Sequence, residues 1–166
     1  MAEIRCDICV IGAGSGGLSV ASGAVQMGAD VVLLEGHKMG GDCLNYGCVP
    51  SKALLAAGHK AHAMGRGAFG VSGGAVRTDF AAAKDHVEQV IASIAPHDSE
   101  ERFKGLGVRV IRDYGRFIDH DRVQVGADVI TARRFVIATG SRPFVPPIPG
   151  LKDVPYLTNE TVFDLR

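Results

Sequence analysis

The sequence predicts an α/β fold in which a parallel sheet carries flanking helices and a small antiparallel β-meander. Two short β-branched segments, Ile4–Ile11 and Val31–Leu34, enclose a glycine-rich turn and an apolar stretch with helical spacing. Longer helical patterns occupy the middle of the chain. From Val108 onward, short β-rich segments alternate with turn residues, which is typical of a meander.

The N-terminal segment predicts a βαβ unit. The turn Gly12–Gly17 follows the first strand and leads into a helix, which Gly28 is expected to end before the second strand. A strand–helix–strand crossover of this kind is right-handed and its strands are parallel. The apolar positions of the helix are Leu18, Ala21, Ala24 and Val25.

Two helices are predicted in the middle of the chain. The first begins near Cys48–Ser51 and runs towards Met64, and glycines between residues 65 and 74 then indicate a loop. Thr78 is the expected N-cap of the second helix, and Pro96 should break it before a shorter continuation. An apolar stripe on this helix could face the core or a partner helix: Phe80, Ala83, Val87, Val90, Ile91 and Ile94.

The last third of the chain predicts a meander followed by one more buried strand. That strand is Arg134–Ala138, and Thr139 and Gly140 end it. Prolines between Pro143 and Pro149 then predict a stiff, extended segment. The short strands of the meander are Val108–Arg112, Gly115–Ile118, Arg122–Val125 and Val129–Thr131.

Composition and charge exclude several classes of protein. Apolar residues make up 46% and charged residues 22% of the 166 residues, which is typical of a globular protein. Eighteen basic side chains balance eighteen acidic ones, so the basic excess expected of a nucleic-acid-binding protein is missing. No apolar run is long enough to span a bilayer, and the N-terminus lacks a secretory pattern. We therefore expect a cytoplasmic protein that binds neither nucleic acid nor membrane.

The turn Gly12–Gly17 matches the dinucleotide-binding pattern G-x-G-x-x-G. Gly12 permits the tight turn, Gly14 lets the backbone approach a pyrophosphate, and Gly17 allows close helix–strand packing. The N-terminus of the helix offers amide groups and partial positive charge to the phosphates. Glu35, at the end of the second strand, can accept hydrogen bonds from the hydroxyls of an adenosine ribose. This context predicts a Rossmann-like dinucleotide fold for FAD or NAD, and the alternative is a merely glycine-rich turn.

The segment Gly40–Lys52, GGDCLNYGCVPSK, holds two cysteines five positions apart. On a regular helix, Cys43 and Cys48 would be separated by about 7.5 Å of rise and about 140° of rotation. Disulfide-bonded residues have Cα atoms within roughly 4.4–6.8 Å, so a bonded pair requires irregular backbone, which Gly47 would permit. The closed ring is short, so such a bond would stabilise the fold little and is better explained by thiol–disulfide exchange. The alternative is two unrelated cysteines.

A helix that begins at Cys48 would also affect the chemistry of that thiol. The positive end of the helix and the nearby Lys52 both favour the thiolate form, which is the nucleophile in thiol–disulfide exchange. The segment therefore combines an unusual backbone with a thiol placed for reaction.

Taken together, the two motifs resemble those of the class I pyridine nucleotide–disulfide oxidoreductases, which include dihydrolipoamide dehydrogenase, glutathione reductase and mercuric reductase. The active-site signature of this family reads approximately GGTCLNVGCIPSK, and Gly40–Lys52 matches it at most positions. A second family motif, ATG after a late strand, is present in Val136–Pro143, VIATGSRP. The order and spacing of the motifs agree over essentially the whole chain.

The resemblance implies an enzyme that passes electrons between NAD(P)H, FAD, the Cys43–Cys48 pair and a thiol or disulfide substrate. It is most like dihydrolipoamide dehydrogenase. Mercuric reductase is the main alternative, and the tail Tyr156–Glu160 looks more like its relatives. The small-molecule substrate and the choice between NAD and NADP are left open by the sequence.

The resemblance also implies roles for individual residues. FAD would be bound non-covalently, with Glu35 on the adenosine ribose and the backbone of Gly115 against the adenine. Cys48 would be the thiol nearest the flavin, Cys43 the interchange thiol that meets substrate, and Lys52 would lie beside the reactive edge of the isoalloxazine. The other residues implied to line the dinucleotide are Gly12, Gly14, Ser15, Gly16, Gly17, Gly41, Asp42, Thr139, Gly140 and Ser141.

The resemblance further implies a domain division. Residues 1–150 would form an FAD-binding domain with a redox-active disulfide, and residues 151–166 would begin a linker toward an NAD(P)-binding domain. The family continues with that domain, a return segment that completes the FAD domain, and a dimer-interface domain. We therefore expect a truncated protein that is inactive alone and binds FAD weakly, and a homodimer for the full-length enzyme. Asp42 replaces the usual threonine, and a carboxylate near a pyrophosphate is unfavourable unless a donor or water intervenes.

Other interpretations of the sequence remain open. A stand-alone nucleotide-binding module would explain Gly12–Glu35 but leaves the cysteine segment unexplained. A structural or assembly domain could use the apolar stripe of Phe80–Ile94. Cys6 and Cys9 have the C-x-x-C spacing of zinc and redox sites, but in a regular strand they point to opposite faces with Cα atoms about 10 Å apart. We interpret them as small buried residues, and no metal site is predicted.

Overall fold

The computed structural model describes residues 2–166, which fall into two compact units. The first unit contains the chain through Cys43 together with Ala95–Ser141, and the second contains Leu44–Ile94 and Arg142–Arg166. Among the described residues, no helix combines the length and apolar character needed to cross a bilayer. The domain boundary expected after residue 150 stays a prediction.

A six-stranded sheet forms the centre of the first unit, in the order β5-β2-β1-β8-β7-β6. β5, β2, β1 and β8 are parallel, whereas β7 and β6 are antiparallel to their neighbours. The predicted α/β class is therefore confirmed. The strands are β1 (Glu3–Ile11), β2 (Val31–Leu34), β5 (Arg109–Ile111), β6 (Gly115–Asp119), β7 (Arg122–Val125) and β8 (Asp128–Ile137).

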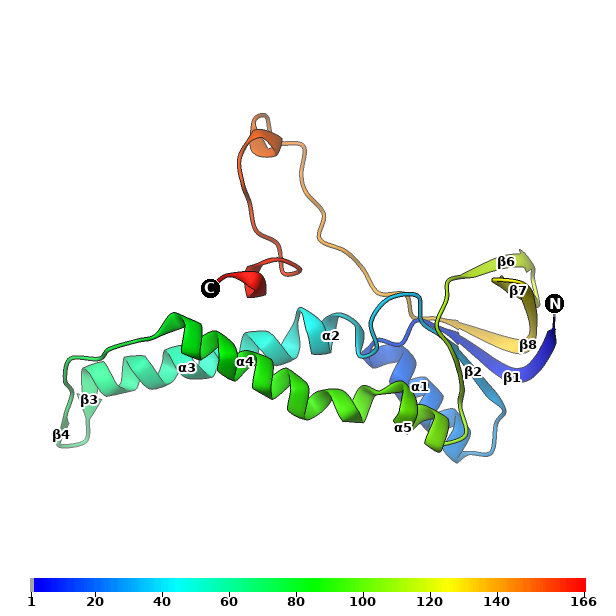
Figure 1. Cartoon of the computed structure of the whole chain (residues 1–166), viewed down its shortest axis with the longest axis horizontal. Coiled ribbons are helices and arrows are strands. Elements are labelled where there is room, and N and C mark those ends of the chain that lie inside the picture. The colour runs from blue at the N-terminus through cyan, green and yellow to red at the C-terminus, as the bar shows by residue number, and fades with distance from the viewer. Residues whose placement is uncertain (1) are drawn as a thin grey trace. The chain divides into compact units, whose positions relative to one another are not determined.

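Helices cover one face of the parallel strands, and the antiparallel end of the sheet folds over their other face (Figure 1). Helices α1 (Ser15–Gln26) and α5 (Glu100–Gly105) lie on the first face, where Phe103 is almost fully buried. On the opposite face β7 packs over β2, so that Val123 and Leu34 belong to one core cluster. Both faces of the parallel strands are buried, which explains their nearly continuous apolar sequence.

Along strand β1, the alternation of side chains between the two faces of the sheet is interrupted at Asp7. The backbone N–H groups of Asp7 and Ile8 both donate to the Asp30 carbonyl, at 2.9 and 3.1 Å. As a result, Cys6 and Cys9 belong to the same core cluster under the meander, whereas Ile8 packs on the helix face. The expectation that the two thiols point to opposite faces is wrong, because it assumed a regular strand. Both cysteines are buried, as predicted.

The second unit is built on two helices, α3 (Cys48–Arg66) and α4 (Phe80–Ile94), which pack against each other. A two-stranded hairpin follows α3, formed by β3 (Gly67–Ala68) and β4 (Val71–Ser72). The remaining helical elements of the chain are α2 (Gly41–Asn45) and the 3₁₀ turns η1 (Ala95–Asp98), η2 (Leu151–Asp153) and η3 (Val162–Asp164).

The C-terminal residues of the second unit dock on α4. Lys84 is only 2% exposed, and its ammonium donates to the Phe163 carbonyl and lies 5.5 Å from the centroid of the Phe163 ring. Arg166 forms ion pairs with Asp85 at 2.7 Å and Glu88 at 3.3 Å. A buried ammonium requires an acceptor of this kind, because burying it unpaired would be costly. Polar contacts therefore hold the tail to α4.

Two strands of the structure, β5 and β8, differ from the prediction. The segment expected as the first strand of the meander forms β5, which instead pairs in parallel with β2 at the sheet edge. β8 is one continuous strand, whereas Val129–Thr131 and Arg134–Ala138 were expected to be separate. Its beginning pairs with β7, and nearly its whole length pairs with β1. The pairing with β1 keeps it extended through Ala132 and Arg133, which lie between the two predicted pieces.

The helices also differ from expectation in detail. Asp79, rather than Thr78, caps α4, since its Oδ1 accepts a hydrogen bond from the Ala82 N–H at 3.0 Å. Pro96 does interrupt the helical pattern, but α5 is a separate helix with its own N-cap, Ser99. Of the apolar stripe on α4, Val87 is the member that is fully buried. Helix α2 and the β3–β4 hairpin were not predicted.

Two glycines set the geometry of the dinucleotide turn. Gly12 has a φ of 105°, a conformation that residues with a side chain rarely adopt. A Cβ atom on Gly17 would lie 1.8 Å from the Gly12 carbonyl oxygen, so α1 can start this close to β1 only with glycine at that position. In contrast, a Cβ atom on Gly16 would meet no atom within 4 Å.

The substitution Gly17→Ala is expected to lower the free energy of unfolding by about 3 kcal/mol, because the added methyl must displace the Gly12 backbone. Gly16→Ala, one residue away in the same helix, is the matched control. It should be neutral or stabilising, since alanine favours a helix by roughly 0.5–1 kcal/mol over glycine. Urea unfolding followed by circular dichroism measures both, and equal stabilities would contradict the contact.

Candidate functional site

The predicted dinucleotide turn lies where the parallel strands β1, β2 and β8 end. The Gly12 N–H donates to the Leu34 carbonyl and the Ala138 N–H donates to the Ile11 carbonyl, both at 2.8 Å. A Cβ atom on Gly12 would lie 2.3 Å from the Ala138 carbonyl oxygen and 3.1 Å from the Cα of Thr139. The ATG segment therefore touches the turn itself, at the sheet edge where open α/β folds bind their ligands.

Glu35 follows β2 and reaches back to the turn. Its Oε2 accepts a hydrogen bond from the Ala13 N–H at 2.7 Å, and its Oε1 accepts one from the His37 N–H at 2.6 Å. These two bonds fix the orientation of the carboxylate. Each oxygen retains a further lone pair, so the group can also accept hydrogen bonds from ribose hydroxyls.

The N-terminus of α1 offers backbone donors to an anion. Its N-cap is Gly14, so no side chain occupies the cap position. The first N–H groups of a helix have no partner within the helix, and the helix dipole makes that end positive. Ser15 and Gly16 are exposed here, and a Cβ atom on Gly16 would meet open space. The residues present therefore fit a pyrophosphate group.

A second backbone segment packs against the turn. Gly40 pairs with Gly14 in an isolated parallel bridge, and the Gly40 N–H donates to the carbonyl of the preceding residue, Ala13, at 2.9 Å. A Cβ atom on Gly41 would lie 2.6 Å from the Cα of Gly14. This contact places the start of α2, which carries Asp42 and Cys43, beside the dinucleotide turn.

The backbone between the two cysteines is irregular. Helix α2 ends at Asn45 and α3 begins at Cys48, so Tyr46 and Gly47 interrupt the helical path. A regular helix would have excluded a bond between Cys43 and Cys48, and the break removes that obstacle.

The first turn of α3 is well formed. Its N-cap is Gly47, whose carbonyl accepts a hydrogen bond from the Ser51 N–H at 3.1 Å. Cys48 and Lys52 are both exposed in this turn and belong to the second unit, whereas Cys43 is half-buried in the first. The predicted helix start at Cys48 is confirmed, and the redox roles stay predictions.

Gly115 and its neighbours lie near the end of β2. A Cβ atom on Gly115 would come within 2.7 and 2.8 Å of side chains on β2 and β7, so the residue is closely packed. Tyr114, which the sequence did not single out, covers Gly36, whose Cβ atom would lie 2.5 Å from the tyrosine ring. Arg112 donates to the His37 carbonyl. The sequence signal that could have indicated Tyr114 is an aromatic residue directly before Gly115.

The last predicted residues follow β8. Thr139, Gly140 and Ser141 are exposed, and Gly140 has a φ of 72°. Thr139 adjoins the turn through its contact with Gly12. The structure thus brings the turn, Glu35, Gly41 and the ATG segment to one sheet edge.

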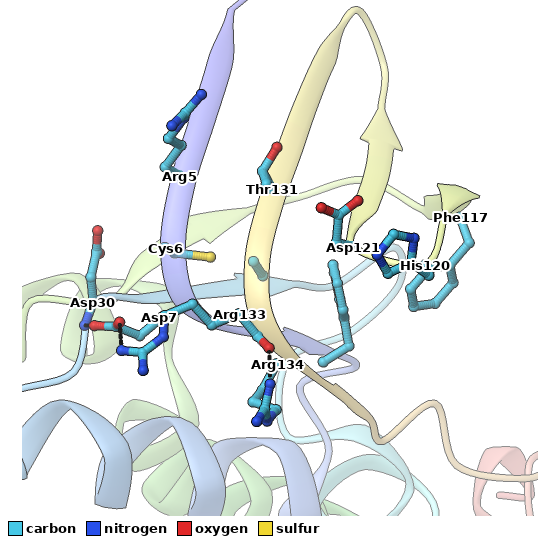
Figure 2. Close-up of a pocket in the computed structure, with 12 residues that line it drawn as sticks. Arg5, Cys6, Asp7, Asp30, Phe117, His120, Asp121, Thr131, Arg133 and Arg134 are labelled. Carbon is cyan, nitrogen blue, oxygen red and sulfur yellow. Dashed lines mark hydrogen bonds and ion pairs between the residues drawn. The ribbon is translucent and has the colours of Figure 1, made fainter.

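A separate hollow of about 940 Å³ is lined by residues 5–7 of β1 and residues 131–135 of β8 (Figure 2). Cys6 lines it, and burial raises the pKa of this thiol to about 11. Thr131 also lines it, with a buried Oγ1 that has no hydrogen-bond partner among the described residues. Arg133 is paired with Asp7 at 3.0 Å. Since an ion pair already occupies part of the lining and the thiol is unreactive, we assign the hollow no ligand.

Three residues near this hollow bring possible cation ligands together: the ligand atoms of Asp119, His120 and Asp121 lie within 4.8 Å of one another. These three residues were not predicted to be ligands from the sequence. Arg122 donates to Asp119 at 2.9 Å and holds the pKa of that carboxyl below its usual range. Asp119 also accepts a hydrogen bond from the His120 ring, which raises the pKa of His120. A guanidinium already occupying the cluster opposes a metal ion, so we assign none.

Comparisons with known proteins bear on this site as a whole. A family model described as pyridine nucleotide-disulphide oxidoreductase matches residues 6–165. The chain is 33% identical over 165 residues to a mercuric reductase of Lysinibacillus sphaericus, covering 99% of this chain and 30% of that protein. It is 37% identical over 144 residues to the chloroplastic dihydrolipoyl dehydrogenase 2 of Arabidopsis thaliana, covering 84% of this chain and 25% of that protein.

A solved structure has the same fold. It is the Cu(II) complex of the HOCl-induced flavoprotein disulfide reductase RclA from Escherichia coli, with a TM-score of 0.78 at 24% identity, covering 96% of this chain and 34% of that one. The chain therefore spans 25–34% of the length of these three proteins. Enzymes of the matched family depend on FAD and use NAD(P)H as co-substrate. The family model matches nearly all residues of the chain, including the dinucleotide turn and the cysteine segment. This chain therefore belongs to the pyridine nucleotide–disulphide oxidoreductase family.

Proposed function

We propose that this chain is the FAD-binding, redox-disulfide part of a flavoprotein disulfide oxidoreductase. The observation that carries the proposal is the interruption of the helix between Cys43 and Cys48. This part of the chain comes directly after Gly40, which is bridged to the dinucleotide turn. A nucleotide-binding module without redox chemistry needs the turn and Glu35 but has no use for a broken helix with a cysteine on either side. The family match over residues 6–165 also supports the redox interpretation.

The backbone at the sheet edge supports the assignment of the cofactor-binding residues. The N–H groups at the start of α1 would hold the pyrophosphate, with Gly14 and Gly16 leaving room for it. Glu35, already oriented by two backbone N–H groups, would accept the ribose hydroxyls. When bound, FAD would supply the group that exchanges a hydride with nicotinamide and electrons with the disulfide. Gly41, Gly115, Thr139, Gly140 and Ser141 would line the rest of the dinucleotide.

The roles proposed for the two cysteines follow from the family resemblance. Cys43 would act as the interchange thiol, attacking a substrate disulfide to form a mixed disulfide and releasing one substrate thiolate. Cys48 would then attack the Cys43 sulfur, close the Cys43–Cys48 disulfide and release the second thiolate. The two protein thiols lose two electrons and the substrate disulfide gains them. The exposed position of Cys48 in the first turn of α3, near Lys52, suits a nucleophile.

The identity of the substrate is also a proposal. Dihydrolipoamide is the first candidate, suggested by the resemblance of the motifs to those of dihydrolipoamide dehydrogenase and by one relative named dihydrolipoyl dehydrogenase. Mercuric reductase is the second candidate, favoured by the number of similar proteins with that name. A domain boundary after residue 150 and a homodimer for the full-length enzyme are also proposals that follow from the resemblance. A cytoplasmic location is a proposal that follows from the sequence.

Mild oxidation is expected to remove two of the four thiols, those of Cys43 and Cys48, because only these two are accessible. Burial raises the pKa of Cys6 to about 11 and that of Cys9 to about 12, so neither forms a thiolate near neutral pH. Thiol titration in denaturant after diamide treatment gives the count, and peptide mass spectrometry gives the linkage.

Two sets of variants control this experiment. Either Cys43→Ser or Cys48→Ser should prevent the loss of an intramolecular pair, whereas Cys6→Ser should leave it unchanged. A protein that keeps all its thiols after mild oxidation, or that pairs different cysteines, would contradict the redox proposal.

FAD should bind this chain weakly, with a dissociation constant above about 1 μM, because the resemblance assigns part of the flavin site to a return segment beyond these residues. Fluorescence titration of FAD measures the affinity. Glu35→Gln should weaken any binding further by removing one carboxylate oxygen, and Glu101→Gln, an exposed residue on α5, is the matched control. Saturable submicromolar binding would refute the expected weakness.

A further inference from the structure

The carboxylate of Glu35 is carried by an irregular loop that follows β2. Residues 35–39 lie between β2 and the bridge at Gly40, and none of them belongs to a helix or strand. The second residue of the loop is Gly36, and a glycine restricts the backbone less than any other residue type. The orientation of the carboxylate therefore depends on what holds this loop from outside.

The connection between β5 and β6 packs against the beginning of the loop. The Glu35 N–H donates to the carbonyl of Ile111, the last residue of β5, at 3.0 Å. The ring of Tyr114 lies so close to Gly36 that a Cβ atom there would come within 2.5 Å of it. Both contacts limit the movement of the loop, and both lie inside the first unit.

Arg112, from the same connection, acts on the residue that orients Glu35. Its guanidinium donates to the His37 carbonyl, and the His37 N–H donates to the Oε1 of Glu35 at 2.6 Å. A second nitrogen of the guanidinium lies 3.9 Å from a carboxylate oxygen of Glu100 on α5, and Glu100 is also paired with Lys104 at 2.5 Å. Arg112 therefore ties the loop to α5.

We propose that Arg112 is a positioning residue for the dinucleotide site. By fixing His37, it holds the Glu35 carboxylate where it accepts the ribose hydroxyls, so that the site selects ribose over deoxyribose. Without the guanidinium, His37 is free to shift, and the carboxylate keeps only its bond from the Ala13 N–H, at 2.7 Å. This inference rests on the proposed function, because the ribose belongs to the bound dinucleotide.

An arginine near a ribose can instead bind a 2′-phosphate, as in sites for NADP. Two features of this structure oppose that role. The guanidinium already has the His37 carbonyl and the Glu100 carboxylate as partners. In addition, the Glu35 carboxylate would repel a phosphate on the same ribose. The contacts therefore favour positioning over phosphate binding.

The test uses the whole 166-residue chain and four adenosine nucleotides. ADP is the adenosine and pyrophosphate half of FAD, and 2′-deoxy-ADP lacks one ribose hydroxyl. AMP and adenosine 2′,5′-bisphosphate differ by a 2′-phosphate. NMR titration gives the dissociation constants, including millimolar ones. The unaltered chain should bind ADP roughly fivefold more tightly than 2′-deoxy-ADP, the effect of about one hydrogen bond.

Arg112→Met should lower this preference to about twofold, because the hydrogen bond to the His37 carbonyl is lost. It should leave the ratio of AMP to the bisphosphate unchanged. Arg112→Lys should keep most of the preference, since an ammonium also donates to a carbonyl. Arg109→Met is the matched control and should keep all of it, because Arg109 is an exposed arginine of β5 on the same side of the loop sequence but outside these contacts.

Hydrogen exchange provides a readout that needs no ligand. In Arg112→Met, the His37 N–H should exchange with solvent faster than in the unaltered chain. The Gly12 N–H donates to the Leu34 carbonyl at 2.8 Å, away from the guanidinium, and should exchange at an unchanged rate. Equal acceleration at both amides would indicate general loosening and would contradict a local role for Arg112.

The outcomes separate the two proposals. If the unaltered chain binds no nucleotide at millimolar concentration, the dinucleotide site of the proposed function fails and this inference fails with it. If ADP binds and Arg112→Met keeps the full preference for ribose, the dinucleotide site stands and the positioning role is wrong. An effect of Arg112→Met on the bisphosphate alone would identify a phosphate ligand and also overturn it. A reduced preference that Arg112→Lys restores supports the proposal.

Discussion

Helix α1 starts directly against the end of β1 because Gly17 lets the backbone of the helix touch the carbonyl of Gly12. The rest of the site depends on this contact. It aims the first N–H groups of α1 across the edge where three parallel strands end, and it leaves the Ala13 N–H within reach of Glu35. The same turn pairs with Gly40, so the segment that carries Cys43 begins beside it. One backbone contact thus joins the expected cofactor site to the cysteine segment.

Elements with strong local signals were predictable from the sequence. β2 matches its predicted range, and β1 and α3 differ from theirs by only a few residues at their ends. Each of these segments combines an apolar run or helical spacing with glycine or proline near its ends. The tight turn at Gly12 and the close helix–strand packing at Gly17 were also predictable, since both follow from short-range geometry. The break between α2 and α3 was expected only as a condition for a bond between the cysteines, and the structure shows it.

Features that depend on distant pairing were not predictable. β5 has too few residues to show whether it joins the meander or the parallel edge, and only its contact with β2 decides this. β8 looked like two strands because polar residues interrupt its apolar pattern, but pairing with β1 keeps it continuous. The double hydrogen bond to Asp30 that puts Cys6 and Cys9 under the meander, and the ring of Tyr114 over Gly36, are likewise tertiary contacts.

We propose that the irregular backbone after Asn45 lets the sulfurs of Cys43 and Cys48 bond reversibly beside a bound flavin. A crystal structure of the oxidised protein tests this most directly, through the distance between the Sγ atoms of Cys43 and Cys48. We expect a covalent bond of about 2.05 Å that spans the break between α2 and α3. Two separate sulfurs in fully oxidised crystals, or a bond from either one to a different cysteine, would contradict it.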